Sequence, residues 1–184
     1  MRVVIVYESM FGNTRQVAEA IGAGVGSEHD VSVMPVALAS EEVVSSADLV
    51  FVGGPTHLHG MSRSKSRQAA GEMAGKPDSG LALEPGAEGD GLREWLGGTG
   101  AIVTSAAAFD TKMHGPAALT GRASTRIDRL LRRHGARIVA GPMSFLVRKD
   151  NRLDPGELDR ARGWGGQVVA AASARPSAEL VGSE

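Results

Sequence analysis

Cysteine is absent from the 184-residue chain, which excludes disulfide bonds, thiol nucleophiles and cysteine-ligated metal clusters. Aromatic residues are scarce, at 4% of the sequence, so the core has to be built mainly from aliphatic side chains. Neither sign of charge dominates, because 20 basic residues are balanced by 21 acidic ones. A balanced chain has no overall field that would attract nucleic acid or an anionic membrane, and the sequence predicts neither partner.

Long apolar runs are also missing. No segment approaches the roughly 18 consecutive apolar residues that a membrane-spanning helix needs. The apolar stretch at the N-terminus, MRVVIVYES, is too short for a secretory signal and is followed by no cleavage-type site. We therefore predict a soluble cytoplasmic protein without membrane insertion.

The sequence does contain apolar, mostly β-branched runs that alternate with amphipathic segments. Continuous apolar runs are typical of strands buried on both faces of a parallel sheet. Strands are expected at residues 3–6, 31–36, 49–52, 101–103 and 138–147, the last broken at Gly141-Pro142. The alternation predicts an α/β fold, a doubly wound five-stranded parallel sheet, in a single domain over residues 1–173. Residues 174–184 are expected to form a disordered C-terminal tail.

Helices are expected between these strands. The helical segments are residues 13–25, 40–46, 64–74, 92–96, 120–134 and a C-terminal segment that starts at Asp154-Pro155-Gly156-Glu157. In that last start, Asp154 is expected to be the N-cap and Pro155 the first helical residue. Residues 76–91 are rich in Gly and Pro and predict a long loop.

In a doubly wound sheet, ligands bind beyond the carboxyl ends of the strands. The first loop there, residues 9–14, offers the donors Ser9, Asn13 and Thr14, and Gly12 lets the backbone bend closely around a ligand. The loop leads into a helix N-terminus, which favours an anion. It has neither a P-loop lysine nor GxGxxG, so a monophosphate such as that of FMN fits best. The alternative is an ordinary turn in which Asn13 or Thr14 caps the helix.

The segment Ser9-Met10-Phe11-Gly12-Asn13-Thr14 resembles the phosphate loop of flavodoxin-like FMN-binding proteins. Its aromatic residue before the glycine is similar to the form in flavodoxin-like quinone reductases. Gly53-Gly54-Pro55-Thr56, followed by Gly60, resembles the loop that lies along the isoalloxazine ring. The segment from Thr104 to Met113 takes the place of the second ring loop. The resemblance covers Arg2 to about Ala172 and implies the flavodoxin-like strand order 2-1-3-4-5 of the short-chain type.

The resemblance implies that FMN is bound non-covalently and carries out the redox chemistry. The residues expected to bind it are Ser9, Phe11, Gly12, Asn13 and Thr14 at the phosphate, Met10 in the same loop, and Pro55, Thr56, His57, Leu58, His59, Gly60, Ser105, Ala106, Ala107 and Phe109 at the ring. Phe109 is expected on one ring face, with His57 and His59 near the other. No catalytic side chain is expected, and two histidines two residues apart without a nearby carboxylate make a poor metal site.

Two features depart from flavodoxins that act as electron carriers. Those proteins usually press a Trp and a Tyr against the ring, whereas Trp95 and Trp164 here fall in expected helices and Tyr7 ends a strand. The strong acidic charge with which carriers meet basic partners is also absent. Three functions stay open: electron transfer with a redox protein partner, NAD(P)H-dependent reduction of quinones or similar small acceptors, and a flavin-free interaction module. The oligomeric state is open as well.

The spacing of several arginines suggests a second place where an anion could bind. Arg122, Arg126, Arg129, Arg132 and Arg133 follow helical spacing, and the ordinary interpretation is a solvated helix face. The alternative is a docking surface for an acidic partner or for the phosphate of NADPH. Arg63, Lys65 and Arg67, which follow the second loop, suggest the same alternative for an anionic nicotinamide cofactor.

Overall fold

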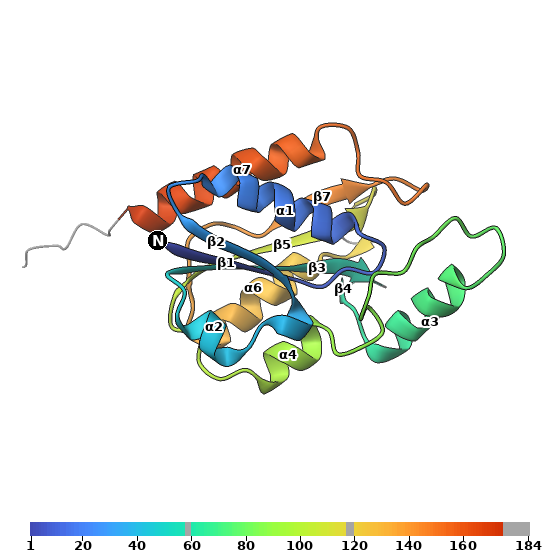
Figure 1. Cartoon of the computed structure of the whole chain (residues 1–184), viewed down its shortest axis with the longest axis horizontal. Helices are drawn as coiled ribbons and strands as arrows, with labels where there is room; N and C mark the ends of the chain where they lie inside the picture. Colours follow the sequence, from blue (N-terminus) through green and yellow to red (C-terminus); the bar gives the residue numbers. More distant parts are fainter. Residues whose placement is uncertain (58–59, 117–119, 175–184) are drawn as a thin grey trace, which may run out of the picture.

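A computed structural model of the chain describes residues 1–57, 60–116 and 120–174. A parallel sheet forms its centre, with helices on both faces (Figure 1). The strands are β1 (Arg2–Tyr7), β2 (Asp30–Pro35), β3 (Leu49–His57), β5 (Ser105–Met113), β6 (Arg137–Ile138) and β7 (Met143–Val147), with a short β4 (Gly60–Met61) antiparallel to the end of β3. Their order is β2-β1-β3-β5-β6, and β7 also pairs with β5.

The strand order confirms the doubly wound, flavodoxin-like prediction. Both β6 and β7 pair in parallel with β5, one with its start and the other with its end. They are therefore two halves of one strand, interrupted around Gly141-Pro142 as the sequence predicts. Counted as one strand, they give the predicted order 2-1-3-4-5.

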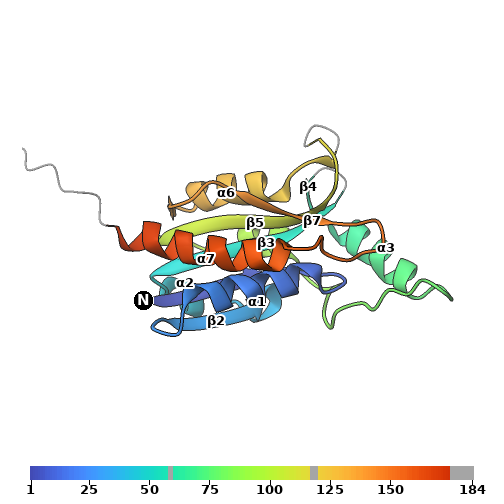
Figure 2. The same cartoon turned by 90° about the horizontal axis from the view of Figure 1, so that it is seen from above.

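Helices cover the sheet in two layers. They are α1 (Asn13–Val25), α2 (Glu41–Ser45), α3 (Ser64–Ala74), α4 (Leu92–Gly98), α6 (Ala123–Arg133) and α7 (Glu157–Ser173), with a 3₁₀ turn at Val36–Leu38. Helices α1 and α7 lie side by side on one face (Figures 1 and 2). Helices α2, α4 and α6 pack on the other face. Helix α3 extends from one end of the sheet (Figure 1). In the described part of the chain, the helices are too short or too polar to cross a bilayer.

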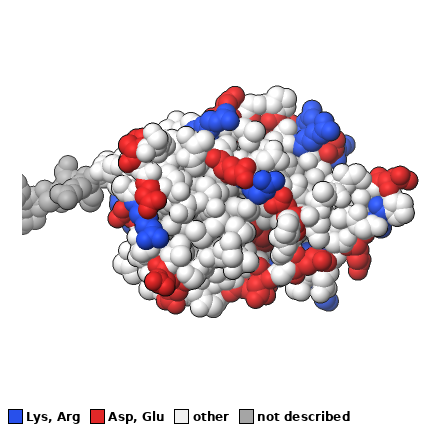
Figure 3. Space-filling model, in the orientation of Figure 1, with Lys and Arg blue, Asp and Glu red and all other residues white. Residues whose placement is uncertain are grey.

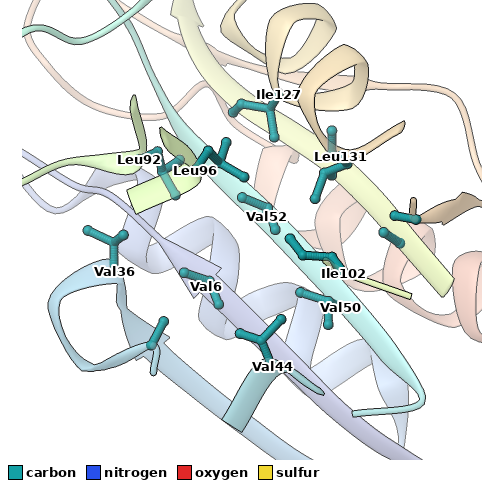
Figure 4. Packing of buried hydrophobic residues seen from close by; sticks show 14 of the residues in the cluster. Val6, Val36, Val44, Val50, Val52, Leu92, Leu96, Ile102, Ile127 and Leu131 are labelled. Atoms are coloured by element: carbon teal, nitrogen blue, oxygen red, sulfur yellow. The ribbon is translucent and has the colours of Figure 1, made fainter. Parts of the chain in front are cut away.

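The core follows from strand periodicity, because successive side chains of a strand point to opposite faces. Val50 and Val52 of β3 pack against α2, α4 and α6, as Figure 4 shows. Phe51, between them, points to the other layer, where its ring meets Trp164 of α7 edge to face at 5.5 Å between centroids. Burying each such side chain contributes about 1.5–3 kcal/mol, so both layers hold the sheet firmly.

Close packing of α1 against α7 depends on glycine. A Cβ at Gly165 would lie 2.5 Å from the carbonyl oxygen of Ile21, closer than real Cβ contacts allow. The absence of a side chain at this position therefore sets the distance between the two helices. It also explains a glycine beside Trp164 in the middle of a helix, where it costs about 1 kcal/mol of helix propensity.

Some predicted boundaries are wrong. Strand β3 does not end at residue 52 but continues through Gly53-Gly54-Pro55 to His57. Residues 101–103 are not a strand, and β5 begins only at Ser105. Ile102 still packs in the core, but Val103 is 83% exposed. At the last helix, Pro155-Gly156 forms a turn, and α7 begins at Glu157 with Gly156 as its N-cap.

The long loop over residues 76–91 is confirmed, since it contains no helix or strand. It folds back over the first loop, because the Glu84 N–H donates to the Met10 carbonyl at 2.8 Å. Ala87 is buried with Met10 and Ala70 in a small apolar cluster. The prediction of a disordered tail falls largely on residues 175–184, which lie outside the described residues.

Candidate functional site

A pocket of about 280 Å³ opens at the carboxyl ends of β1, β3 and β5. It is lined by Ser9, Met10, Phe11, Asn13, Thr14, Pro55, Thr56, His57, Thr111, Lys112, Met113, Val147 and Asn151. The structure thus brings the first two predicted loops together at one place. None of the described lining residues is acidic, and none is Trp or Tyr.

The first loop is shaped by Gly12. Its φ of 88° lies in the left-handed region, which favours glycine. The Gly12 N–H donates to the Ser9 hydroxyl at 3.1 Å, and helix α1 begins at the next residue. The first turn of a helix leaves N–H groups without an intrahelical acceptor, so they point toward the loop. This arrangement is a suitable anion site.

Neither Asn13 nor Thr14 caps the helix, which contradicts the alternative of a simple capped turn. The Asn13 amide instead donates to the backbone carbonyl and the side-chain oxygen of Asn151, both at 3.0 Å. The Thr14 hydroxyl lies 2.8 Å from that of Thr111. Both side chains therefore join α1 to segments that follow much later in the chain.

Asn151 lines the site without having been predicted there, whereas Thr111 lies in the segment predicted as the second ring loop but was not among the residues expected to bind. Asn151 has a φ of 57°, a left-handed conformation that Asn tolerates better than most residues. Thr111 lies in β5 and is 4% exposed. The sequence carries no local signal for either contact, since both partners are distant along the chain.

The second loop supplies the opposite wall of the pocket. Pro55, Thr56 and His57 stand at the end of β3 and line the pocket as expected. Burial lowers the pKa of His57 below its ordinary value, and the carboxylate of Glu8 offsets part of that effect. The predicted ring residues Leu58 and His59 lie outside the described residues. Gly60 lies in β4 and lines a neighbouring pocket.

Thr56 also has a structural task. Its hydroxyl donates to the Asp110 carboxylate at 3.0 Å and accepts from the Ala123 N–H at 2.9 Å. The same carboxylate oxygen accepts from the Ser124 N–H at 2.8 Å. Asp110 is fully buried, so Thr56 and Asp110 together satisfy the first amides of α6.

The third predicted loop has to be corrected. Ser105, Ala106, Ala107 and Phe109 do not form a loop, because they lie inside strand β5. Their side chains are buried in the sheet, and they do not line the pocket. Strand β5 starts and ends later than predicted. Thr111, Lys112 and Met113 therefore line the pocket where Ser105 to Phe109 were expected.

Phe109 illustrates this correction. Its ring packs edge to face against Phe145 and Trp164, with centroid distances of 6.4 Å to each. A Cβ at Gly53 would lie 2.3 Å from the Phe109 ring, so the ring lies directly against that glycine. Phe109 is a core residue and not a stacking partner for a ligand in this pocket.

Lys112 gives the pocket a basic side chain. The residue is 7% exposed, and its ammonium group donates to the Gly115 carbonyl at 3.1 Å. On the other side of the first loop, Arg15 pairs with Glu84 at 3.0 Å. This pairing compensates the negative charge that the covering loop brings close to Gly12.

The residues present fit FMN. Hydroxyls, an amide and the N–H groups at the start of α1 are donors suited to a phosphate monoester. Met10, Phe11, Met113 and Val147 offer apolar and polarisable surface for a flat ring system. A buried cation and the absence of acidic lining residues favour a negatively charged group.

Comparison with solved structures finds the same fold. A flavodoxin from the domain Archaea superposes with a TM-score of 0.63 at 18% identity, covering 94% of this chain and 99% of its own. Oxidised flavodoxin 1 from Bacillus cereus gives a TM-score of 0.63 at 15% identity, with 92% and 98% coverage. The flavodoxin, WrbA-like protein from Agrobacterium tumefaciens gives 0.53 at 18% identity, with 93% and 96% coverage.

A search of curated protein sequences finds no significant match. The family model described as flavodoxin, in contrast, matches residues 5–168, which is most of the chain and includes the first two predicted loops. Together with the strand order, this match shows that the chain belongs to the flavodoxin family.

Proposed function

We propose that the protein binds FMN non-covalently in the 280 Å³ pocket and transfers electrons through it. One observation carries the proposal. The left-handed Gly12 at the start of α1 and the end of β3 meet around a pocket whose described lining has no carboxylate. When bound, FMN supplies the redox chemistry, so the chain needs no catalytic acid or base of its own.

The residues of the pocket have separate tasks. Ser9, Asn13 and Thr14, with the N–H groups at the start of α1, would hold the phosphate. Met10, Phe11 and the ends of β3 and β5 would hold the ring and exclude water from it. The Arg15–Glu84 pair would keep the covering loop in place over Gly12.

A second candidate is an NAD(P)H-dependent reductase of quinones or similar small acceptors. The exclusion of both tryptophans from the pocket favours it, because the ring would lack large aromatic covers. Trp164 is buried in the core, and the Trp95 indole N–H donates to the Ala39 carbonyl at 2.7 Å. An uncovered ring would be accessible to a small reaction partner.

The first experiment is an absorbance spectrum of purified protein after addition of FMN and desalting. Retained flavin bands with shifted maxima are expected, at one FMN per chain. A spectrum without retained flavin would favour the flavin-free interaction module instead.

Two further experiments test the phosphate site and separate the two candidate functions. The double variant Ser9→Ala, Thr14→Val should weaken FMN much more than riboflavin, and equal losses for both would show that the first loop is not the phosphate site. Stopped-flow mixing with NADPH tests the reductase. Bleaching no faster than that of free FMN would leave electron transfer with a protein partner. The redox partner and the cytoplasmic location stay predictions, and the oligomeric state stays open.

A further inference from the structure

A second pocket, of about 520 Å³, adjoins the first. Its lining includes Arg63, Arg93, Arg122, Arg126 and Arg129, and none of its described lining residues is acidic. His57 lines both pockets, so the two meet at the end of β3. We call this site the arginine pocket. The face shown in Figure 3, by contrast, mixes basic and acidic residues, as the balanced composition predicts.

The five arginines come from three segments. Arg63 precedes α3, and Arg93 lies in α4. Arg126 and Arg129 lie at positions i and i+3 of α6, which places them on one face of the helix, and Arg122 is the N-cap residue just before it. The charged stripe in the sequence is therefore not only a solvated helix face, because part of it forms a wall of a concave site.

Two of these arginines are fixed by neutral groups. Arg93 donates to the carbonyls of Ser62 and Met61, both at 3.0 Å. Arg122 donates to the Ser144 hydroxyl at 3.1 Å and to the Pro142 carbonyl at 3.0 Å. These bonds orient the guanidinium groups without neutralising their charge.

Within the described residues, the ion pairs involve other arginines and two histidines, and none of these five arginines. Two carboxylates are near enough to influence Arg93, and both are already hydrogen-bonded. Glu8 accepts from the Leu92 N–H at 2.8 Å, and Glu94 pairs with the buried Arg67 at 3.2 Å. The pKa of Arg93 is lowered by burial and by the charges of Arg126 and Arg63, with Glu94 and Glu8 opposing. The pocket thus concentrates positive charge that the nearby carboxylates of Glu8 and Glu94 do not balance.

Such a site favours a small anion that carries a phosphate group. A cleft lined by one sign of charge attracts the opposite charge and raises its local concentration. Guanidinium groups bind phosphate oxygens through paired N–H donors. The volume lies in the range of small-molecule sites, about 300–1,000 Å³, and the concave shape does not suit a flat protein surface.

We propose that the arginine pocket binds the phosphoryl group of a small phosphorylated reductant. The reductant would be oxidised by losing a hydride, two electrons and one proton, and the flavin bound next to it would be reduced by accepting that hydride. The binding part of this proposal stands without the flavin, and the electron exchange rests on the proposed function. A phosphoryl group held by α4 and α6 would leave the organic part of the ligand at His57, on the boundary with the first pocket.

The test is calorimetric titration of the purified protein with inorganic pyrophosphate. We compare the wild type with the double variant Arg126→Gln, Arg129→Gln. Both side chains are exposed and Gln suits a helix as well as Arg does, so the variant should fold. The matched control is Arg132→Gln, Arg133→Gln, which removes the same charge from the same helix outside the pocket.

Pyrophosphate should bind the wild type at one site and bind the pocket variant at least tenfold more weakly, with the control within about twofold of wild type. The wild-type affinity should also fall as salt increases. Equal affinities for the wild type and the pocket variant would overturn the proposal. Binding of a polyglutamate peptide without binding of pyrophosphate would overturn it too, in favour of an acidic protein partner.

A second arm distinguishes the sources of the phosphoryl group and separates the two proposals. Tighter binding of NADPH than of pyrophosphate would assign the pocket to a nucleotide, and weaker binding would assign it to a smaller phosphorylated compound. Pyrophosphate binding without FMN binding would refute the flavin function and the electron exchange but keep the anion site. FMN binding without pyrophosphate binding would refute the anion site in the arginine pocket but keep the proposed flavin function. With both bound, pyrophosphate should shift the visible spectrum of FMN.

Discussion

The hydroxyl of Thr14 lies 2.8 Å from the hydroxyl of Thr111, and both residues are almost completely buried. This contact joins the start of α1 to the end of β5, across 97 positions of the sequence. Two hydroxyls that share one hydrogen bond use only one of their two hydrogens. The pair therefore keeps one donor that is available to a phosphate at the loop.

Replacing Thr111 by Val should weaken FMN binding by about five- to twentyfold. The substitution leaves the Thr14 hydroxyl without its partner, and a lost buried hydrogen bond of this kind costs about 1–2 kcal/mol. Fluorescence titration of FMN and riboflavin measures the effect, and riboflavin should lose much less. Thr104→Val is the control, because Thr104 bonds to the Ala47 carbonyl at 2.9 Å, away from the pocket. An unchanged FMN affinity in Thr111→Val would show that the threonine pair has no part in the site.

Lys112→Met should lower the reduction potential of bound FMN. Reduced flavin carries negative charge, and a buried ammonium group at the pocket wall favours that charge by about 2 kcal/mol at an effective dielectric constant near 20. Potentiometric titration with visible absorbance measures the shift. Lys65→Met, an exposed residue of α3, serves as the control and should leave the potential unchanged. Equal potentials for the wild type and Lys112→Met would place this charge outside the flavin's environment.

His57 should make the protein less stable in acid. Because burial depresses its pKa in the folded state, the unfolded chain binds the proton more readily. Stability is therefore full above the unfolded pKa of about 6.5 and decreases as pH falls toward the lower folded pKa. Thermal unfolding between pH 7.5 and 5 should show a smaller decrease for His57→Gln than for the wild type. Parallel pH profiles for the two proteins would contradict the effect.

The sequence predicted some strands of the sheet more accurately than others, and the difference follows from the residues that form each strand. The β-branched runs at the centre of the sheet predicted β1 and the start of β3 correctly, since such residues pack well between two helical layers. Strand β5 contains Ser105-Ala106-Ala107-Ala108 instead, and alanine has a low strand propensity. Tertiary burial determines its structure, because these small residues fill the space between neighbouring strands and helices. Local preference therefore predicted a loop where a strand exists.

That shift explains the errors in the site. The phosphate loop and the end of β3 were found because they contain local signals: a glycine before a helix, and a Gly-Gly-Pro that follows a run of apolar residues. The contribution of β5 comes from Thr111 to Met113, at the end of the predicted segment and beyond Phe109, the last of its residues that were expected to bind. The arginine stripe on α6 was visible as a pattern, but its concave setting depends on Arg63 and Arg93 from other elements.

Asp110→Ala should reduce the free energy of unfolding by about 2 kcal/mol. The Asp110 carboxylate accepts hydrogen bonds from the Thr56 hydroxyl and the Ser124 N–H, so its removal leaves both buried donors unpaired at the start of α6. Urea denaturation measures the loss. The control is Asp128→Ala, whose partner Arg132 is exposed on the same helix and whose loss should cost under about 1 kcal/mol.

The same substitution links the two pockets. Asp110 and Thr56 position the N-terminus of α6, and that helix carries Arg126 and Arg129. Asp110→Ala should therefore weaken pyrophosphate binding although it removes a negative charge from the region. Electrostatics alone predicts the opposite, tighter binding of the anion. The sign of the change in affinity thus decides whether Asp110 acts by placing the helix or only through its charge.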